Sequence, residues 1–244
     1  MKKILGLIII TSIILVTACK DDDDVEPDYG TKARLSGSVE LFDEGDNKLS
    51  KDSMLVFISG TNPLISDTTD IHGNFEFKDV IYGTYSITFS KKSYGTFTLN
   101  HIYHQKGDTK IASTVQLGQF SSTKVTLLSS NVSGSAIYIS ITTDPTGSTS
   151  IPRYLRLYYY TSDDVSSIHY TDYSNIITAT ISPYVYKVNL HKLIDLGFKS
   201  GDKVWVKAYG DALHSNDYID LVSGKHIFPN LNLHSAAAVS FIMP

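Results

Sequence analysis

Apolar residues alternate with polar residues in short runs along most of this chain, and this period of two constrains the fold most strongly. Leu35, Val39 and Leu41 share one face of such a run, and Val204 and Val206 share one face of another. Successive side chains of a β-strand point to opposite faces of its sheet, so each run predicts a half-buried strand. Long runs with helical spacing are absent, and strand-favouring residues are plentiful. The sequence therefore predicts an all-β protein.

The beginning of the chain departs from this pattern. Two lysines open an apolar run over residues 4–16, and two small residues precede Cys19. The run is shorter than the ~20 residues that a membrane-spanning helix needs, so it is typical of a secretory signal peptide. Four aspartates at 21–24 then predict an extended, solvated tether, because like charges repel. We assign residues 1–18 to a signal peptide and residues 19–31 to Cys19 and this acidic tether.

The segment Val16-Thr17-Ala18-Cys19 resembles the lipobox of bacterial lipoproteins. The resemblance implies that the Cys19 thiol receives a diacylglycerol, that the signal is cut before it, and that the new amino group is acylated. Several acyl chains together make such anchoring effectively permanent. Cys19 is the only cysteine of the chain, as this use predicts. The alternative is an ordinary secreted protein with a cysteine near its cleavage site.

The aspartate run after Cys19 resembles the acidic export signal of surface lipoproteins in one Gram-negative phylum. It implies an outer-membrane location, with the body facing the cell exterior and the membrane as a partner through the lipid on Cys19.

The body of the chain is nearly neutral. The chain of 244 residues has a formal net charge of -4, and beyond residue 28 nineteen acidic residues stand against eighteen basic ones. This balance lacks the basic field of nucleic-acid-binding proteins, so we predict no nucleic-acid partner. Because no cysteine follows Cys19, disulfides cannot stabilise the body, and each domain needs its own hydrophobic core.

Two consecutive antiparallel β-sandwich domains are predicted, over residues 32–119 and 120–244. In the first, the apolar run 54–58 is expected to be a strand buried on both faces. A turn is expected near Asp70, whose carboxylate can accept hydrogen bonds from backbone amides, and Gly73 can adopt positive φ there.

The first domain shares a set of turn and core residues with a known family. They are Leu35-Ser36-Gly37-Ser38-Val39, Val56-Phe57-Ile58-Ser59-Gly60, Thr69-Asp70, Gly73, Phe75, Phe77, Val80, Gly83, Tyr85 and Tyr94. On these residues the segment 32–118 resembles the carboxypeptidase regulatory-like domain, a transthyretin-like β-sandwich. Residues 81–82 depart from the usual prolines, and Ser93 replaces a glycine. The resemblance implies a non-catalytic accessory module, found beside peptidases, in outer-membrane receptors and in surface lipoproteins.

The second domain resembles an immunoglobulin or fibronectin type III sandwich. The run from Leu193 through Gly197 to the alternating residues 204–208 is similar to the approach into the sixth strand of fibronectin type III domains. Val204 stands where that family has a core tyrosine. Helical spacing near Leu193, followed by Gly197 at a C-cap position, predicts one helical turn.

Motifs of catalysis and of metal or phosphate binding are absent from the sequence. We therefore predict no enzyme activity, no cofactor and no metal. His101 and His104 would point to opposite faces of a strand, so we interpret both as surface polar residues. The acidic residues Asp43, Glu44, Asp46 and Asp52 lack the spacing of a calcium loop, and we interpret them as a solvated hairpin loop.

Aromatic residues are the remaining functional signal. Arg156, Tyr158 and Tyr160 share one face of a predicted strand, and Trp205 and Tyr209 share one face of a later strand. Flat aromatic faces with polar tips suit sugar rings, whose axial C–H faces are apolar while their rims form hydrogen bonds. These five residues are our candidate ligand-binding residues. The alternative is that they pair across strands or pack against the first domain.

The sequence thus predicts a non-enzymatic surface lipoprotein that binds carbohydrate or a partner outer-membrane protein. The alternative is a structural or adhesive spacer without a small-molecule ligand. An enzyme with an unrecognised site is the third hypothesis. Exposure of Trp205 and Tyr158 on one concave face would favour binding, and burial of both between the domains would favour a structural role.

Overall fold

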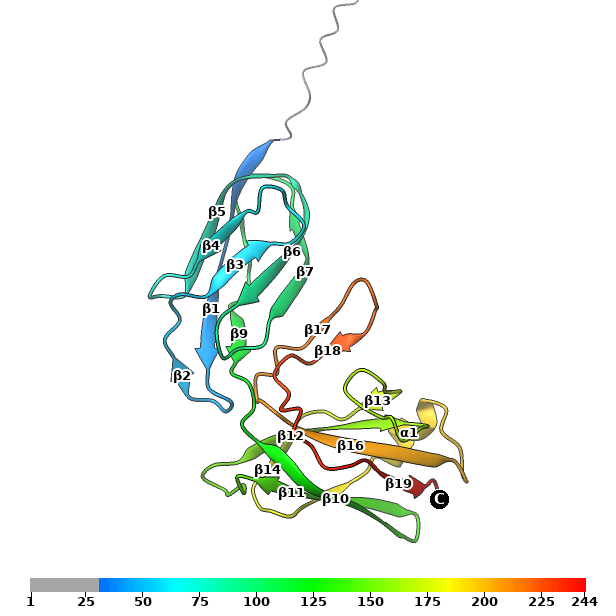
Figure 1. Ribbon diagram of the computed structural model, residues 1–244. Helices are drawn as coiled ribbons and strands as arrows, with labels where there is room; N and C mark the ends of the chain where they lie inside the picture. The colour runs from blue at the N-terminus through cyan, green and yellow to red at the C-terminus, as the bar shows by residue number, and fades with distance from the viewer. Residues whose placement is uncertain (1–30) are drawn as a thin grey trace, which may run out of the picture.

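The computed structural model describes residues 31–244, and its regular structure is almost entirely β (Figure 1). One short helix accompanies the strands within that part of the chain. The prediction of an all-β protein is therefore confirmed. The predicted signal peptide, Cys19 and the aspartate run lie outside the described residues.

Within the described residues 31–244, we find no helix with the length and apolar character that a membrane span requires.

The first module consists of nine strands in two packed sheets. They are β1 (Lys32–Phe42), β2 (Lys48–Leu49), β3 (Leu55–Ile58), β4 (Ser66–Thr68), β5 (Asn74–Ile81), β6 (Gly83–Ser90), β7 (Phe97–His104), β8 (Thr109–Lys110) and β9 (Val115–Gly118). One sheet is built around β1, which pairs with β2, β5, β8 and β9, and the other has the order β4-β3-β6-β7.

The sandwiches are mainly antiparallel, as predicted, but the sheet around β1 also contains two parallel pairings. Strands β8 and β9 both pair with β1 in parallel. The period of two reports which face of a strand is buried and carries no information on the direction of its neighbour. By running along β1 in the same direction, β9 carries the chain toward the second module (Figure 1).

The core of the first module lies between these two sheets. Its almost fully buried side chains are Leu35, Leu41, Met54, Val56, Ile58, Phe77, Val80, Ile87, Phe89 and Leu117. The predicted turn is present: Asp70 Oδ1 accepts hydrogen bonds of 2.8 Å from the backbone N–H of His72 and of Asn74. Gly73 has a φ of 81° there, as expected.

Two expectations for the first module are wrong. The strand β3 buries one face only, because Leu55 on its other face is 41% exposed. His104 is fully buried, whereas His101 is exposed. The ring nitrogens of His104 lie 2.7 Å from Thr109 Oγ1 and 3.1 Å from the Val80 carbonyl oxygen, so hydrogen bonds compensate its burial.

The second module contains the remaining strands and the helix. They are β10 (Lys124–Ser133), β11 (Ala136–Asp144), β12 (Arg153–Tyr160), β13 (Asp172–Tyr173), β14 (Ile177–Ala179), β15 (Tyr184–Lys187), α1 (Leu190–Asp195), β16 (Lys203–Asp211), β17 (Tyr218–Ile219), β18 (His226–Ile227) and β19 (Val239–Ile242). One sheet has the order β10-β11-β15, and β12 joins β13 and β14 to β16 and β19 in the other. Between them lies a core that includes Ile139, Leu157, Leu193 and Val206.

The single helical turn is where the sequence predicts it. The side chain of Asn189 caps the first turn of α1 by accepting a hydrogen bond from the Lys192 backbone N–H. Gly197 follows the helix with a φ of 95°, the conformation that favours glycine.

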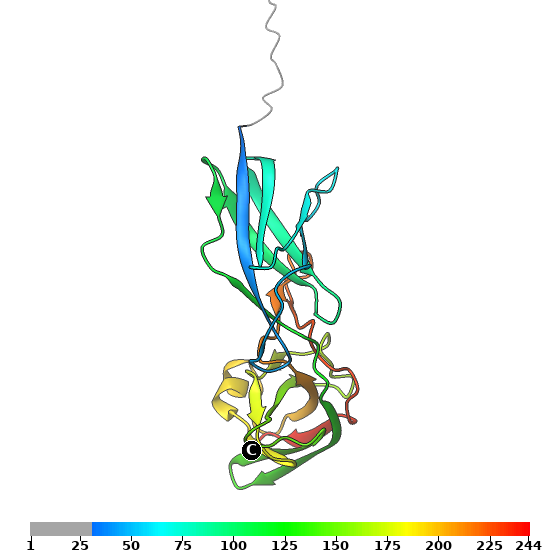
Figure 2. The same ribbon diagram turned by 90° about the vertical axis from the view of Figure 1, so that its left-hand side faces the viewer.

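The two modules stand end to end in both views (Figures 1 and 2). The hairpin β17–β18 rises from the second module beside β7 of the first, and Asn100 Nδ2 donates a 2.7 Å hydrogen bond to the Ile219 carbonyl oxygen. The rings of Phe42 and His214 stack across the junction with their centroids 3.9 Å apart. The modules are therefore joined by packed side chains as well as by the chain itself.

The acidic loop of the first module is part of this junction, which corrects its interpretation as merely solvated. Glu44 accepts hydrogen bonds from the Ser122 backbone N–H (2.7 Å) and hydroxyl (2.7 Å), and forms an ion pair of 2.9 Å with Arg153. Asp43 stabilises the loop by accepting hydrogen bonds from the backbone N–H of Gly45 and Asn47.

Candidate functional site

Three of the five candidate ligand-binding residues are buried, so the five do not share an exposed face. Tyr158 is 0% exposed, and Tyr209 and Arg156 are each 4% exposed. Arg156 and Tyr209 are directly opposite each other on β12 and β16, as the strand pattern implies. The face that they share is covered by other parts of the second module.

The cover is a second hydrophobic cluster on the outer face of this sheet. Val165 from the loop after β12, and Phe228 and Leu231 from the segment after β18, pack with Tyr158 and Tyr209. Their rings meet edge to face: the centroids of Tyr158 and Phe228 are 5.6 Å apart, and so are those of Tyr158 and Tyr209. Such contacts stabilise a core, so aromatic packing explains these positions.

Arg156 is held by an ion pair inside this cluster. Its Nε lies 2.7 Å from Asp211 Oδ2, its Nη1 donates a 3.1 Å hydrogen bond to the Ser174 carbonyl oxygen, and its guanidinium lies 4.3 Å from the Phe228 ring centroid. Burial raises the pKa of Asp211, and the charge of Arg156 opposes this rise. Arg156 is therefore a largely neutralised cation whose position is fixed by its partners.

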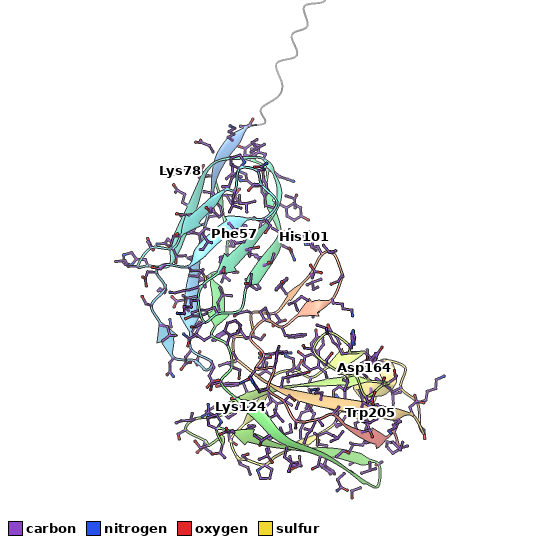
Figure 3. All side chains as sticks on the ribbon, in the orientation of Figure 1. Phe57, Lys78, His101, Lys124, Asp164 and Trp205 are labelled. Atoms are coloured by element: carbon purple, nitrogen blue, oxygen red, sulfur yellow. The ribbon has the colours of Figure 1, made fainter. Side chains whose placement is uncertain are left out.

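Trp205 and Tyr160 are half-buried and lie opposite each other on β16 and β12. The Lys203 Nζ lies 4.5 Å from the centroid of the Trp205 ring. Figure 3 places Trp205 well away from the junction between the modules. These two aromatic residues are separated from the cleft described next.

A cleft of about 670 Å³ opens between the two modules. Its walls are the side chains of Phe97, Gln116, Arg156, Tyr173, Asn175, Ile176 and Asp217 together with residues 213–216. We call this hollow the inter-module cleft. It combines two aromatic rings with amide, carboxylate and guanidinium groups, and it contains Arg156 from the predicted set.

Buried asparagines hold the inter-module cleft in shape. Asn216 Oδ1 accepts a 2.8 Å hydrogen bond from the Gly118 backbone N–H, and Asn230 Oδ1 accepts one of 3.0 Å from the Gly95 backbone N–H. Both asparagines belong to the second module, and both glycines belong to the first. The close approach requires glycine, because a Cβ on Gly118 would lie 2.5 Å from the His214 carbonyl oxygen. The walls of the cleft are therefore preorganised.

Tyr173 separates the inter-module cleft from a smaller hollow of about 150 Å³. Tyr173 and Asn175 line both, and the smaller hollow adds Tyr186 and Lys192. Lys192 Nζ lies 2.9 Å from Asp172 Oδ2 and donates a 2.6 Å hydrogen bond to the Tyr173 carbonyl oxygen. Burial raises the pKa of the Tyr173 hydroxyl, which therefore stays neutral at physiological pH.

The arrangement is suited to recognition of a polar, uncharged surface. Asp217 contributes an exposed carboxylate, and Asn175 and Gln116 contribute exposed amides, each of which both donates and accepts hydrogen bonds. Within residues 31–244, His, Cys, Asp and Glu side chains form no group of three that could hold a metal ion. The groups in the cleft offer hydrogen bonds and aromatic contact.

The sequence analysis did not identify Asn175, Asp217, Phe97 or Tyr173 as residues that line the inter-module cleft. Asn175 and Asp217 lie in loops, where no periodic pattern reports which way a side chain points. Phe97 comes from the other module. The signal that could have found Tyr173 was the density of tyrosines between Tyr154 and Tyr186.

No family model and no curated protein matches this chain. Solved structures resemble it at low identity. A protein of Bacteroides uniformis, provisionally described as carbohydrate binding, is 14% identical with a TM-score of 0.31, covering 87% of this chain and 100% of its own. A DUF3823 family protein from Parabacteroides merdae is 11% identical with a TM-score of 0.31, covering 86% of this chain and 98% of its own.

The chicken CNTN1 FN1–FN3 domains are also similar, at 11% identity and a TM-score of 0.32, covering 88% of this chain and 68% of theirs. At such identities and TM-scores these neighbours carry no argument about the architecture or the ligand of this chain.

Proposed function

We propose that this chain is a non-enzymatic surface lipoprotein that binds carbohydrate in the inter-module cleft. The observation that carries the proposal is the composition of that cleft. Two aromatic rings, from Phe97 and Tyr173, lie beside the hydrogen-bonding side chains of Gln116, Asn175 and Asp217. A sugar ring needs aromatic contact as well as hydrogen bonds, because its axial C–H faces are apolar and its hydroxyl groups form hydrogen bonds.

The shape of the site favours a chain of sugars. The cleft is open to solvent, and the smaller hollow continues it on the other side of Tyr173. A ligand that passes over Tyr173 and Asn175 would contact both hollows. An oligosaccharide has the required length, whereas a monosaccharide would fill only one of them.

The charges of the site favour a neutral glycan. The Arg156 cation is neutralised by Asp211 at 2.7 Å, and the Lys192 cation pairs with Asp172 at 2.9 Å. The Asp217 carboxylate accepts a hydrogen bond from the Ser215 hydroxyl and lies 3.6 Å from His226 Nδ1, but it remains exposed and would repel a uronic acid. Neutral polysaccharides are therefore the expected ligand class.

The anchoring part of the proposal rests on Cys19 and the aspartate run at 21–24, through their resemblance to a lipobox and to an acidic export signal. A lipid on Cys19 would attach the chain to the outer membrane, with the body facing the exterior. The first module, resembling a carboxypeptidase regulatory-like domain, would then act as a spacer. Its strand β1, of 11 residues, extends over about 35 Å between the anchored end and the cleft.

A partner outer-membrane protein is the second candidate, and the tip of the β17–β18 hairpin favours it. Leu221 and Val222 at this tip are 56% and 97% exposed, and Ile219 beside them is 48% exposed. Apolar side chains gathered on a protruding hairpin are typical of protein interaction surfaces.

Calorimetric titration of residues 19–244, with Cys19 replaced by serine, against neutral and acidic polysaccharides tests the carbohydrate proposal. Tyr173→Ala and Asp217→Asn should weaken binding of the neutral ligand. The matched controls are Tyr103→Ala, which removes a tyrosine that is 64% exposed on the first module, and Asp195→Asn on the exposed helix. Binding that is unaffected by Tyr173→Ala, or no binding of any glycan, would contradict the proposed site.

Anchoring is tested separately in cells. Radiolabelled palmitate should be incorporated into the natural chain and should be absent from the Cys19→Ser variant. Protease treatment of intact cells would then test whether the body faces the exterior.

A further inference from the structure

The end of the first module at which β1 begins carries exposed apolar side chains from three segments. Leu64 in the loop between β3 and β4 is 56% exposed, Ile81 at the end of β5 is 44% exposed, and Tyr103 near the end of β7 is 64% exposed. We call this surface the β1-start face. It lies at the opposite end of the first module from the second module (Figure 1).

Strand register places these segments next to one another. Lys32 is paired with Ile81, and Thr84 is paired with Tyr103. The turn between β5 and β6 is fixed by the Tyr85 hydroxyl, which donates a 2.6 Å hydrogen bond to the Ile81 carbonyl oxygen. Ile81 and Tyr103 are therefore displayed by strand ends whose positions are fixed, and Leu64 by the loop between β3 and β4.

Basic side chains surround the apolar ones. Lys32, Lys78 and Lys106 are exposed, and Figure 3 shows Lys78 near this end of the module. Arg34 also lies here, paired with Asp108 at 2.8 Å and with Glu76 at 3.6 Å. Among described residues 31–34, 59–65, 76–84 and 103–108, four bases stand against three acids, Glu76, Asp79 and Asp108. The β1-start face is thus both apolar and net positive.

The chain outside the structure approaches the module at this same face. β1 begins at Lys32, and residues 19–31 can span at most about 45 Å even when fully extended. A lipid on Cys19 would therefore hold the β1-start face within that distance of the bilayer. The second module, attached to the other end, would lie farther away.

We propose that the β1-start face rests on the membrane surface, with Tyr103, Ile81 and Leu64 at the level of the lipid headgroups and the lysines on anionic phosphate groups. This inference rests on the proposed anchoring at Cys19. Aromatic side chains favour the membrane–water interface, and lysines there keep their ammonium groups at the phosphates. The consequence is a defined orientation, with the inter-module cleft facing away from the membrane.

A vesicle experiment tests this proposal without depending on lipidation in cells. Residues 19–244 are coupled through the single thiol of Cys19 to a maleimide lipid, in vesicles containing phosphatidylglycerol and lipids with brominated chains. The reporter is a Tyr103→Trp substitution in a Trp205→Phe background, with the fold checked by circular dichroism. Bromine quenches tryptophan at short range, so the reporter should lose fluorescence relative to vesicles of unbrominated lipid. Trp205 in the natural chain, coupled in the same way, should keep the same fluorescence in brominated and unbrominated vesicles.

Charge reversal provides the matched control. The triple variant Lys32→Glu, Lys78→Glu and Lys106→Glu, made with the same reporter, should lose most of the quenching. Reversal of three exposed lysines of the second module should not change it; these are Lys124, Lys187 and Lys199.

Equal reporter fluorescence in brominated and unbrominated vesicles would overturn the proposal. Quenching that appears only after the aspartates at 21–24 are changed to asparagine would also overturn it, because the basic face would then be binding its own tether. Coupling supplies the anchor chemically, so neither result would bear on lipidation in cells or on glycan binding.

Discussion

Asn216 Nδ2 lies 3.0 Å from Asn230 Oδ1, and this pair of buried side chains joins the two modules. Both residues also bond the backbone of the first module. Asn216 donates to the Gly118 carbonyl oxygen at 3.0 Å, and Asn230 Nδ2 donates to the same oxygen at 3.0 Å. The module orientation, and with it the inter-module cleft, depends on the bonds from these two amides to Gly95 and Gly118, which form only when the modules are docked.

Replacing Asn230 by alanine should loosen the junction. The change leaves the buried Gly95 N–H without an acceptor and removes the donor to Gly118 and His214, which should cost about 2–4 kcal/mol of unfolding free energy. Urea unfolding followed by circular dichroism and by Trp205 fluorescence measures the loss. Asn232→Ala, on the same segment but half-exposed, is the control. Equal stability of the two variants would show that the pair does not hold the modules together.

Gly118→Ala tests the close approach of the Gly118 backbone of the first module to the His214 backbone of the second. The added Cβ would lie 2.5 Å from the His214 carbonyl oxygen and 3.3 Å from the His214 Cβ, so the backbones must separate, at a cost of about 2–3 kcal/mol. Small-angle X-ray scattering should report a larger radius of gyration. At Gly45 the nearest atom would be the Asp43 carboxylate oxygen at 3.3 Å, so Gly45→Ala should have a much smaller effect. An unchanged scattering profile for Gly118→Ala would rule out this account of the junction.

Tyr158→Phe distinguishes a core residue from a ligand-binding one. Within residues 31–244 the Tyr158 hydroxyl is buried without a hydrogen-bond partner, so its removal should leave stability unchanged or raise it by up to about 1 kcal/mol. Tyr158→Ala should instead cost about 3–5 kcal/mol, because it leaves a cavity. Thermal unfolding and calorimetric titration with the glycan measure both effects. Weaker glycan binding by the phenylalanine variant would restore Tyr158 to the binding site.

Glu40 should contribute to the loss of stability in acid. Its hydrogen bond from Lys51 Nζ at 2.7 Å lowers the pKa of the Glu40 carboxyl below 4.5 in the folded state. A carboxyl whose pKa is lower in the folded state stabilises the protein above its unfolded pKa, and this contribution is lost as the pH falls through the folded pKa. The pH profile of the unfolding free energy should therefore be shallower below pH 4.5 for Glu40→Gln. Identical slopes for the variant and the natural chain would contradict this role.

Much of the local structure could be predicted from the sequence. The alternation of Leu35, Val39 and Leu41, the turn at Asp70, and the helical turn that ends before Gly197 depend on neighbours a few residues apart, and the structure contains all three. The sequence pattern also predicted that Arg156 and Tyr158 point to the same side of one strand, and both lie on one face of β12.

Whether that face meets solvent could not be predicted in the same way. The residues that cover it, Val165, Phe228 and Leu231, come from irregular segments distant in sequence. The inter-module cleft likewise combines Phe97 of one module with Tyr173 and Asp217 of the other. Strands and turns depend on period and on local hydrogen bonding, so the sequence was enough to predict them. Which faces are covered, and where a cleft remains, depends on packing between distant segments, because this packing removes apolar surface from water wherever the chain brings that surface together.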